Sequence, residues 1–90
     1  MPWIIDEDLI ASPSARPGTN CNAVGLVGPG SYKGDGSELT ARFQMLDDDG
    51  EVYYRGRCHK YSFGPMDDFG TPNAGCTTIQ YMVNGKWETL

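Results

Sequence analysis

Carboxylate side chains are the most numerous chemically active groups in this sequence, and they fall into three runs. These runs occupy residues 6–8, 47–51 and 67–68. A calcium-binding loop spaces its oxygen ligands on alternate residues and ends in a distant bidentate acid. The run at 47–51 has neither property, so it predicts a solvated turn rather than a calcium site.

The charge balance suggests a second interpretation of these acids, as a binding surface. The chain has 7 Lys and Arg against 12 Asp and Glu, a net charge of −5. Proteins that bind nucleic acid directly set basic groups against phosphates, so this balance disfavours that class. It favours a protein partner with a basic surface, because long-range attraction speeds association. We predict a partner-binding surface made of Asp47, Asp48, Asp49, Glu51, Asp67 and Asp68.

Three cysteines and one histidine are the candidate metal ligands and nucleophiles: Cys21, Cys58, Cys76 and His59. Their number fits zinc, but the paired short spacing of zinc sites is missing. Cys58 and His59 are neighbours, and neighbours on a strand project to opposite faces, so they form no nucleophile pair. We expect three reduced thiols that pack as small buried apolar groups. A small Cys/His metal-binding protein stays as an alternative.

Two further patterns are too incomplete to predict an activity. The glycine-rich stretch at 25–31 lacks the Gly-Lys-Ser/Thr sequence of a phosphate-binding loop. Arg42, Arg55 and Arg57 share one face of a predicted sheet and could stack on bases, but the net charge opposes this. With no acid–base pair or activated nucleophile in the sequence, we expect no enzyme, no cofactor and no metal.

The elements that would position these residues are β-hairpins. Residues 41–58 alternate apolar and polar side chains on both sides of Asp49-Gly50, a dipeptide typical of two-residue type I′ loops. With that loop, Met45 lies opposite Tyr54. Residues 77–90 repeat the pattern around an Asn-Gly dipeptide.

The whole chain is predicted to be mainly β, a single domain of residues 1–90. We expect a small antiparallel sheet of four to six strands, built from the hairpins 41–58 and 77–90 and an N-terminal strand that the acids at 6–8 interrupt. A long loop covers 12–38, interrupted by the short apolar stretch 23–27, which could form an edge strand. At most one short helix forms, a single turn at 64–69 that Gly70 and Pro72 end.

The sequence shows no apolar run long enough for a membrane span and no N-terminal export signal. We therefore expect a cytoplasmic protein that does not associate with membranes.

Two stretches of the C-terminal half carry a resemblance. They are residues 46–57, with the sequence LDDDGEVYYRGR, and residues 65–81, which begin PMDDFGTPNAGCT. Together they resemble a family of short uncharacterised proteins of bacterial genomes and mobile elements such as phages and plasmids. No activity or site residue comes with the resemblance. It implies a small accessory gene on a mobile element, a setting in which small acidic proteins often block a host defence complex.

These observations favour a small acidic, non-enzymatic interaction protein that binds and occludes a basic nucleic-acid-handling host complex, in defence or regulation. The alternative is a structural or assembly module. Such a module would form homo-oligomers through a sheet edge or through exposed Trp87, Tyr53 and Met82.

Overall fold

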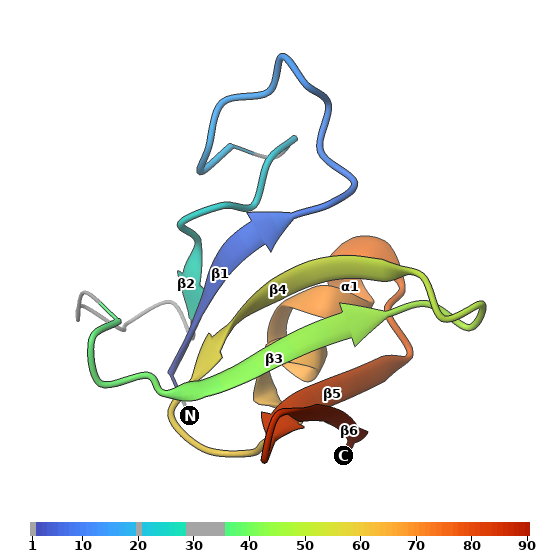
Figure 1. Ribbon diagram of the computed structural model, residues 1–90. Helices are drawn as coiled ribbons and strands as arrows, with labels where there is room; N and C mark the ends of the chain where they lie inside the picture. Colours follow the sequence, from blue (N-terminus) through green and yellow to red (C-terminus); the bar gives the residue numbers. More distant parts are fainter. Residues whose placement is uncertain (1, 20, 29–35) are drawn as a thin grey trace.

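The computed structural model describes residues 2–19, 21–28 and 36–90, which form one antiparallel sheet of six strands. The sheet confirms the predicted mainly β fold. The strands are β1 (Trp3–Asp8), β2 (Val27–Gly28), β3 (Ala41–Leu46), β4 (Val52–Cys58), β5 (Thr78–Val83) and β6 (Lys86–Thr89). Their spatial order is β2-β1-β4-β3-β5-β6 (Figure 1). Part of the predicted loop 12–38, at residues 20 and 29–35, lies outside the described residues.

The hairpin of β3 and β4 has the predicted register from Ala41 to Met45, but the register shifts at Leu46, which lies opposite Val52, and the loop is not the predicted one. Met45 lies opposite Tyr54. The expected two-residue type I′ loop is wrong, because it needs positive φ at both central residues and Asp49 does not have it. Instead, the Gly50 N–H donates to the Asp47 carbonyl at 3.1 Å, and Gly50 itself has φ 83°. This is a type I turn followed by a left-handed glycine, the usual three-residue hairpin loop.

The hairpin of β5 and β6 is built as predicted. Asn84 has φ 51° and Gly85 has φ 82°, the pair of positive values that a type I′ turn requires. Val83 lies opposite Lys86 directly beside the turn. The turn is therefore two residues long, and it fixes the pairing of both strands.

One helical segment follows β4, and it is longer than predicted. It begins as a π-helix, η1 (Met66–Gly70), and continues as α1 (Thr71–Ala74). The expected stop at Gly70 and Pro72 is wrong. Pro72 lies in the first turn of α1, directly after the π-helical segment. Gly70 is buried, and a side chain there would meet the Met45 sulfur, so the helix backbone rests directly on the sheet.

The helix covers one face of the sheet and leaves the other open (Figure 1). Phe69 anchors it, with its ring 5.0 Å from Tyr54 and 5.6 Å from Trp3 between centroids. The core on this side consists of Trp3, Ile5, Ala23, Phe43, Met45, Tyr54, Cys58, Cys76, Ile79 and Tyr81.

Strand β1 runs through the acidic residues that were expected to interrupt it. It ends at Asp8, whose carboxylate accepts the Ala23 N–H at 2.7 Å and the Ile10 N–H at 3.1 Å. These bonds hold the segment after β1 against the end of that strand. The edge strand expected in this region is β2, shifted to Val27–Gly28.

Candidate functional site

The turn between β3 and β4 carries four of the six predicted partner-binding acids, and one of them builds the turn. The Asp47 Oδ1 atom accepts the N–H groups of Asp49 and Glu51, both at 2.9 Å. The backbone bond from Glu51 is the largest cause that holds the pKa of the Asp47 carboxyl below its ordinary value. Asp47 therefore stays ionised near neutral pH, and its carboxylate is occupied by hydrogen bonds within the turn.

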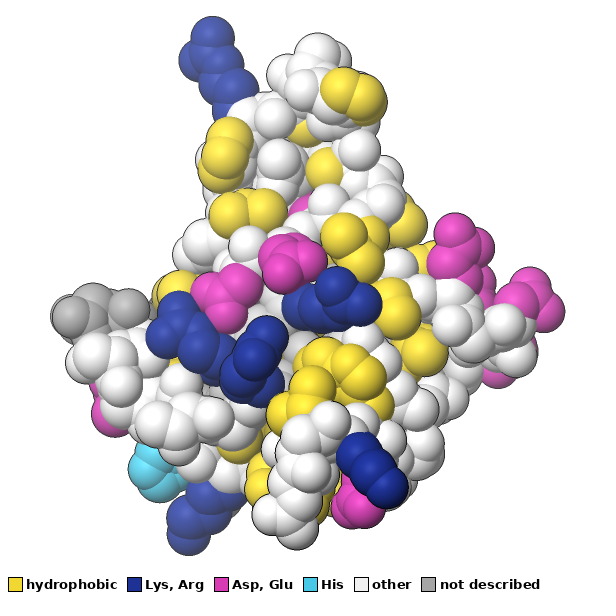
Figure 2. Space-filling model, viewed as in Figure 1, with side chains coloured by type: hydrophobic (Ala, Val, Ile, Leu, Met, Phe, Trp, Pro, Cys, Tyr) yellow, Lys and Arg dark blue, Asp and Glu magenta, His cyan; other side chains and the backbone are white. Residues whose placement is uncertain are grey.

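The other three acids of this turn point into solvent. Asp48, Asp49 and Glu51 are exposed, and within the described ranges none of them forms an ion pair. Figure 2 shows acidic side chains gathered at the right-hand edge of the open face, where this turn projects. We call these three residues the acidic tip. It presents carboxylates on a loop whose geometry Asp47 fixes.

The remaining two predicted acids lie elsewhere. Asp67 and Asp68 are exposed residues of η1. The Asp68 carboxylate accepts the Trp3 indole N–H at 3.1 Å, and Trp3 pairs with Cys58, at the end of β4 furthest from the acidic tip. The six residues therefore form two groups at opposite ends of β4 rather than one surface.

Asp6 and Glu7 on β1 have cationic partners, unlike the acidic tip. Asp6 accepts two hydrogen bonds from the Arg57 guanidinium, at 2.8 and 3.0 Å. Arg57 also donates to the Gly36 carbonyl at 3.0 Å. As predicted, Arg42 and Arg57 share the open face, since they lie directly opposite each other. In Figure 2 the basic side chains gather over the middle of this face, beside acidic ones.

A line of polar side chains crosses the open face through five strands, and sequence reasoning did not identify it. The Arg55 Nη1 atom lies 3.6 Å from Glu7 Oε2. Its Nε donates to Gln44 Oε1 at 3.2 Å. The Gln44 amide donates to Gln80 Oε1 at 2.7 Å, and the Gln80 amide donates to Thr89 Oγ1 at 3.1 Å. We call this line the polar ladder. It links β1, β4, β3, β5 and β6 by side chains as well as by backbone.

The cysteines are not gathered into a cluster of candidate metal ligands in the described part of the chain. Among the described residues, no three His, Cys, Asp or Glu side chains lie close enough together to hold an ion. Cys58 and Cys76 are buried as expected, but Cys21 is exposed, so the prediction of three buried thiols is wrong at that position. Burial raises the pKa of the Cys76 thiol to about 11, which keeps it protonated and unreactive near neutral pH.

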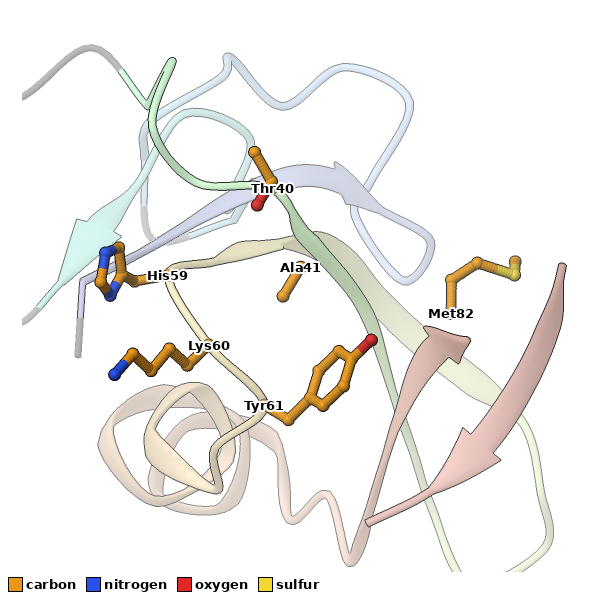
Figure 3. Close-up of a pocket in the computed structure, with 6 residues that line it drawn as sticks. All are labelled: Thr40, Ala41, His59, Lys60, Tyr61 and Met82. Atoms are coloured by element: carbon orange, nitrogen blue, oxygen red, sulfur yellow. The ribbon is translucent and has the colours of Figure 1, made fainter. Parts of the chain in front are cut away.

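A cavity of about 510 Å³ opens where the first residues of β3 and the last of β5 lie beside the segment after β4 (Figure 3). His59 and Lys60 lie on one side of it, and the Tyr61 ring points toward its centre. Ala41 and Met82 give it an apolar lining.

A second cavity, of about 600 Å³, lies between the end of β1 and the end of α1. The exposed Cys21 lines it together with Asp8, Tyr54 and Asn73. The Asn73 amide donates to the Tyr54 hydroxyl at 3.1 Å, and burial raises the pKa of that hydroxyl. Asp8 is already used by two backbone N–H groups, so the polar groups here mainly hold the structure together.

Comparison with known proteins adds no further constraint: no protein-family model, curated protein or solved structure matches the chain. In the described part of the chain, no helix has the length and apolar content that crossing a membrane requires.

Proposed function

We propose that this protein is a non-enzymatic interaction protein that binds a basic surface of a partner protein through its acidic tip. One observation carries the proposal. Asp48, Asp49 and Glu51 stand exposed on a fixed turn, and within the described ranges no cation pairs with them. The acids of β1 have partners within the protein, whereas the tip gathers three exposed acids without one in the described part of the chain, so it is the place where we assign the contact.

The preformed turn favours binding for two physical reasons. Asp47 holds the loop in one conformation, so less conformational freedom is lost when a partner docks. The net charge of −5 adds a long-range attraction that speeds encounter with a basic partner and weakens as salt is added. Binding of this kind would be fast and sensitive to salt.

Occlusion is the mechanism that we propose. A tip that covers the basic groups of a nucleic-acid-handling complex would compete with the phosphates that those groups normally bind. The resemblance to short proteins of mobile elements supports a host defence or regulatory complex as the partner. We place this interaction in the cytoplasm, where the thiols would stay reduced.

Asp67 and Asp68 have a secondary place in this proposal. They lie at the other end of β4 from the tip, and Asp68 is already bonded to Trp3. A partner reaches both groups only if it spans the length of the strand. We therefore assign the main contact to the tip.

A comparison of two double variants tests the proposal. Asp48→Asn with Asp49→Asn and Asp67→Asn with Asp68→Asn remove the same charge from different places. The partner is first isolated from source-cell extract on the immobilised protein, and its affinity for each purified variant is then measured by titration calorimetry at low and moderate salt. We expect the tip variant to lose about tenfold or more in affinity and the helix variant to lose less.

Two outcomes would contradict this assignment. An unchanged affinity of the tip variant at both salt concentrations would exclude the tip as the contact. Equal losses in both variants would show that binding follows net charge and not the position of the acids.

A further inference from the structure

The outer edge of β6 is a second, independent interaction surface. β6 is the last strand of the sheet and pairs with β5 on one side only. All four of its residues are at least partly exposed. An edge strand of this kind offers unpaired N–H and C=O groups to another strand.

The type I′ turn determines which backbone groups face outward. Beside such a turn, the first pair exchanges both of its hydrogen bonds, and the bonding then alternates along the strands. Lys86 is in that first pair, opposite Val83, and the Leu90 N–H donates to the Ile79 carbonyl at 3.0 Å. The backbone groups of residues 86, 88 and 90 therefore face β5. Those of Trp87 and Thr89 face the free edge.

Charge complementarity points to a second copy of this chain as the occupant of the edge. Lys86 and Glu88 lie on the same side of β6, one before and one after Trp87. An antiparallel copy with its Trp87 opposite this Trp87 places Lys86 of each copy opposite Glu88 of the other. The two opposite-charge pairs are cross-strand neighbours, the arrangement that stabilises sheets.

The other registers through the outward-facing residues are less favourable. With Trp87 opposite Thr89 of the second copy, the Glu88 side chains of the two copies lie directly opposite each other and repel. With Thr89 opposite Thr89, Glu88 of each copy lies opposite the uncharged Leu90 of the other. Only the register centred on Trp87 brings unlike charges together.

We propose that the protein self-associates through β6, in an antiparallel arrangement centred on Trp87, with Lys86 of each copy paired with Glu88 of the second copy. The symmetry is two-fold, so the interface is closed and leads to a dimer rather than a filament. The two six-stranded sheets join into one continuous sheet. On the open face, Trp87 already lies opposite Met82, and the Trp87 of the second copy extends this apolar row.

The interface is small. β6 contributes four residues, so it buries much less than the roughly 1,200 Å² of the smallest stable interfaces. We expect a dissociation constant on the order of 100 µM. The dimer would thus form in concentrated solution and dissociate on dilution.

Sedimentation equilibrium with charge-swapped variants tests this arrangement. The wild type, Lys86→Glu, Glu88→Lys and the double swap are compared from about 20 µM to about 1 mM. The net charge changes from −5 to −7 in the first variant (−5 − 2) and to −3 in the second (−5 + 2), and stays at −5 in the double swap. Both positions are exposed, and far-UV circular dichroism checks that each variant keeps its fold.

The proposed register predicts that both single swaps weaken association about tenfold or more, because each sets like charges opposite each other, and that the double swap restores it. General charge repulsion predicts something different, because Glu88→Lys would then strengthen the dimer. A wild type that is monomeric up to about 1 mM would overturn the proposal. So would a dimer that the single swaps leave unchanged or that the double swap does not restore.

Amide hydrogen exchange gives a second readout that does not depend on side-chain charge. We expect the N–H groups of Trp87 and Thr89 to exchange fast in dilute solution and to become protected as the concentration rises. The Glu88 N–H, which faces β5, is protected under both conditions. Protection of Trp87 and Thr89 that does not change with concentration would contradict the use of this edge.

Discussion

Asp47 and Asp48 are adjacent and chemically identical, yet the structure uses them differently. The Asp47 carboxylate accepts hydrogen bonds from two backbone N–H groups of its turn. The Asp48 side chain is exposed and makes no such bond in the described structure. We predict that Asp47→Ala lowers the midpoint of thermal unfolding and that Asp48→Ala leaves it unchanged. Asp47→Asn should lose less than Asp47→Ala, because its amide oxygen can still accept both bonds. Equal midpoints for the two alanine variants would contradict this role.

The same bonds make the contribution of Asp47 depend on pH. They hold its pKa in the folded protein below the ordinary value of 3.8. The stabilisation is therefore fully present above that ordinary value and is lost as the pH falls through the lower, folded value. Urea unfolding at a series of acidic pH values should show the wild type losing this part of its stability, while Asp47→Asn does not.

Residue types alone could identify the acidic groups but not these roles. Nothing in the run Asp47-Asp48-Asp49 indicates which carboxylate turns back to its own backbone, because that depends on the turn type. The error at Cys21 has a similar cause. A cysteine is usually buried, but this one is exposed in the segment after β1.

At the scale of elements, the polar ladder joins five strands by side chains. Gln44 is only 5% exposed, so its amide needs partners, and it finds them in Arg55 and Gln80. We predict that Gln44→Ala and Gln80→Ala each reduce the free energy of unfolding. Together they should reduce it by about 1 kcal/mol less than the sum of the single effects, because the first substitution already removes the shared hydrogen bond. A double-mutant cycle in urea measures this coupling.

A matched control separates direct contact from general weakening of the sheet. Gln44 and Thr89 are both members of the ladder but do not contact each other. The effects of Gln44→Ala and Thr89→Ala should therefore add to within about 0.5 kcal/mol. A coupling between Gln44 and Gln80 no larger than this control would show that the hydrogen bond adds no stability.

The hairpins show how far local sequence predicts elements. Asn84-Gly85 gave both the loop and the register, because both residues take up the positive φ that the turn needs. Asp49-Gly50 gave the register as far as Met45 but neither the loop nor the pairing of Leu46 beside it, since Asp47 offers a competing set of backbone bonds. The helix was predicted too short, because its π-helical start and its contact with Met45 at Gly70 come from tertiary packing.

At the scale of the whole molecule, strand order separates residues that the sequence groups together. β3 lies between β4 and β5, and the helix crosses behind them, so the acids of the hairpin and of the helix end up at opposite ends of β4. Sequence patterning predicts which residues share a face of a hairpin. It carries no signal for where a helix of nine residues, η1 and α1 together, docks on a sheet.

Phe69 decides that docking, because its ring joins the helix to β1 through Trp3 and to β4 through Tyr54. A helix this short is not stable alone in water, so it depends on this contact. We predict that Phe69→Ala reduces the free energy of unfolding by about 2–3 kcal/mol, because it leaves a gap beneath the helix. The Trp3 indole N–H, which donates to Asp68, should then exchange faster with water, as NMR can measure.

Phe63 provides the matched control for this prediction. It is the same residue type, lies just before the helix and is 47% exposed. Only its backbone carbonyl supports the helix, by accepting the Asp67 N–H at 2.8 Å, and that bond survives a side-chain substitution. Phe63→Ala should therefore change the stability by no more than about 0.5 kcal/mol and leave the Trp3 N–H protected. Equal losses in the two variants would mean that apolar area in general, and not the Phe69 contact, holds the helix on the sheet.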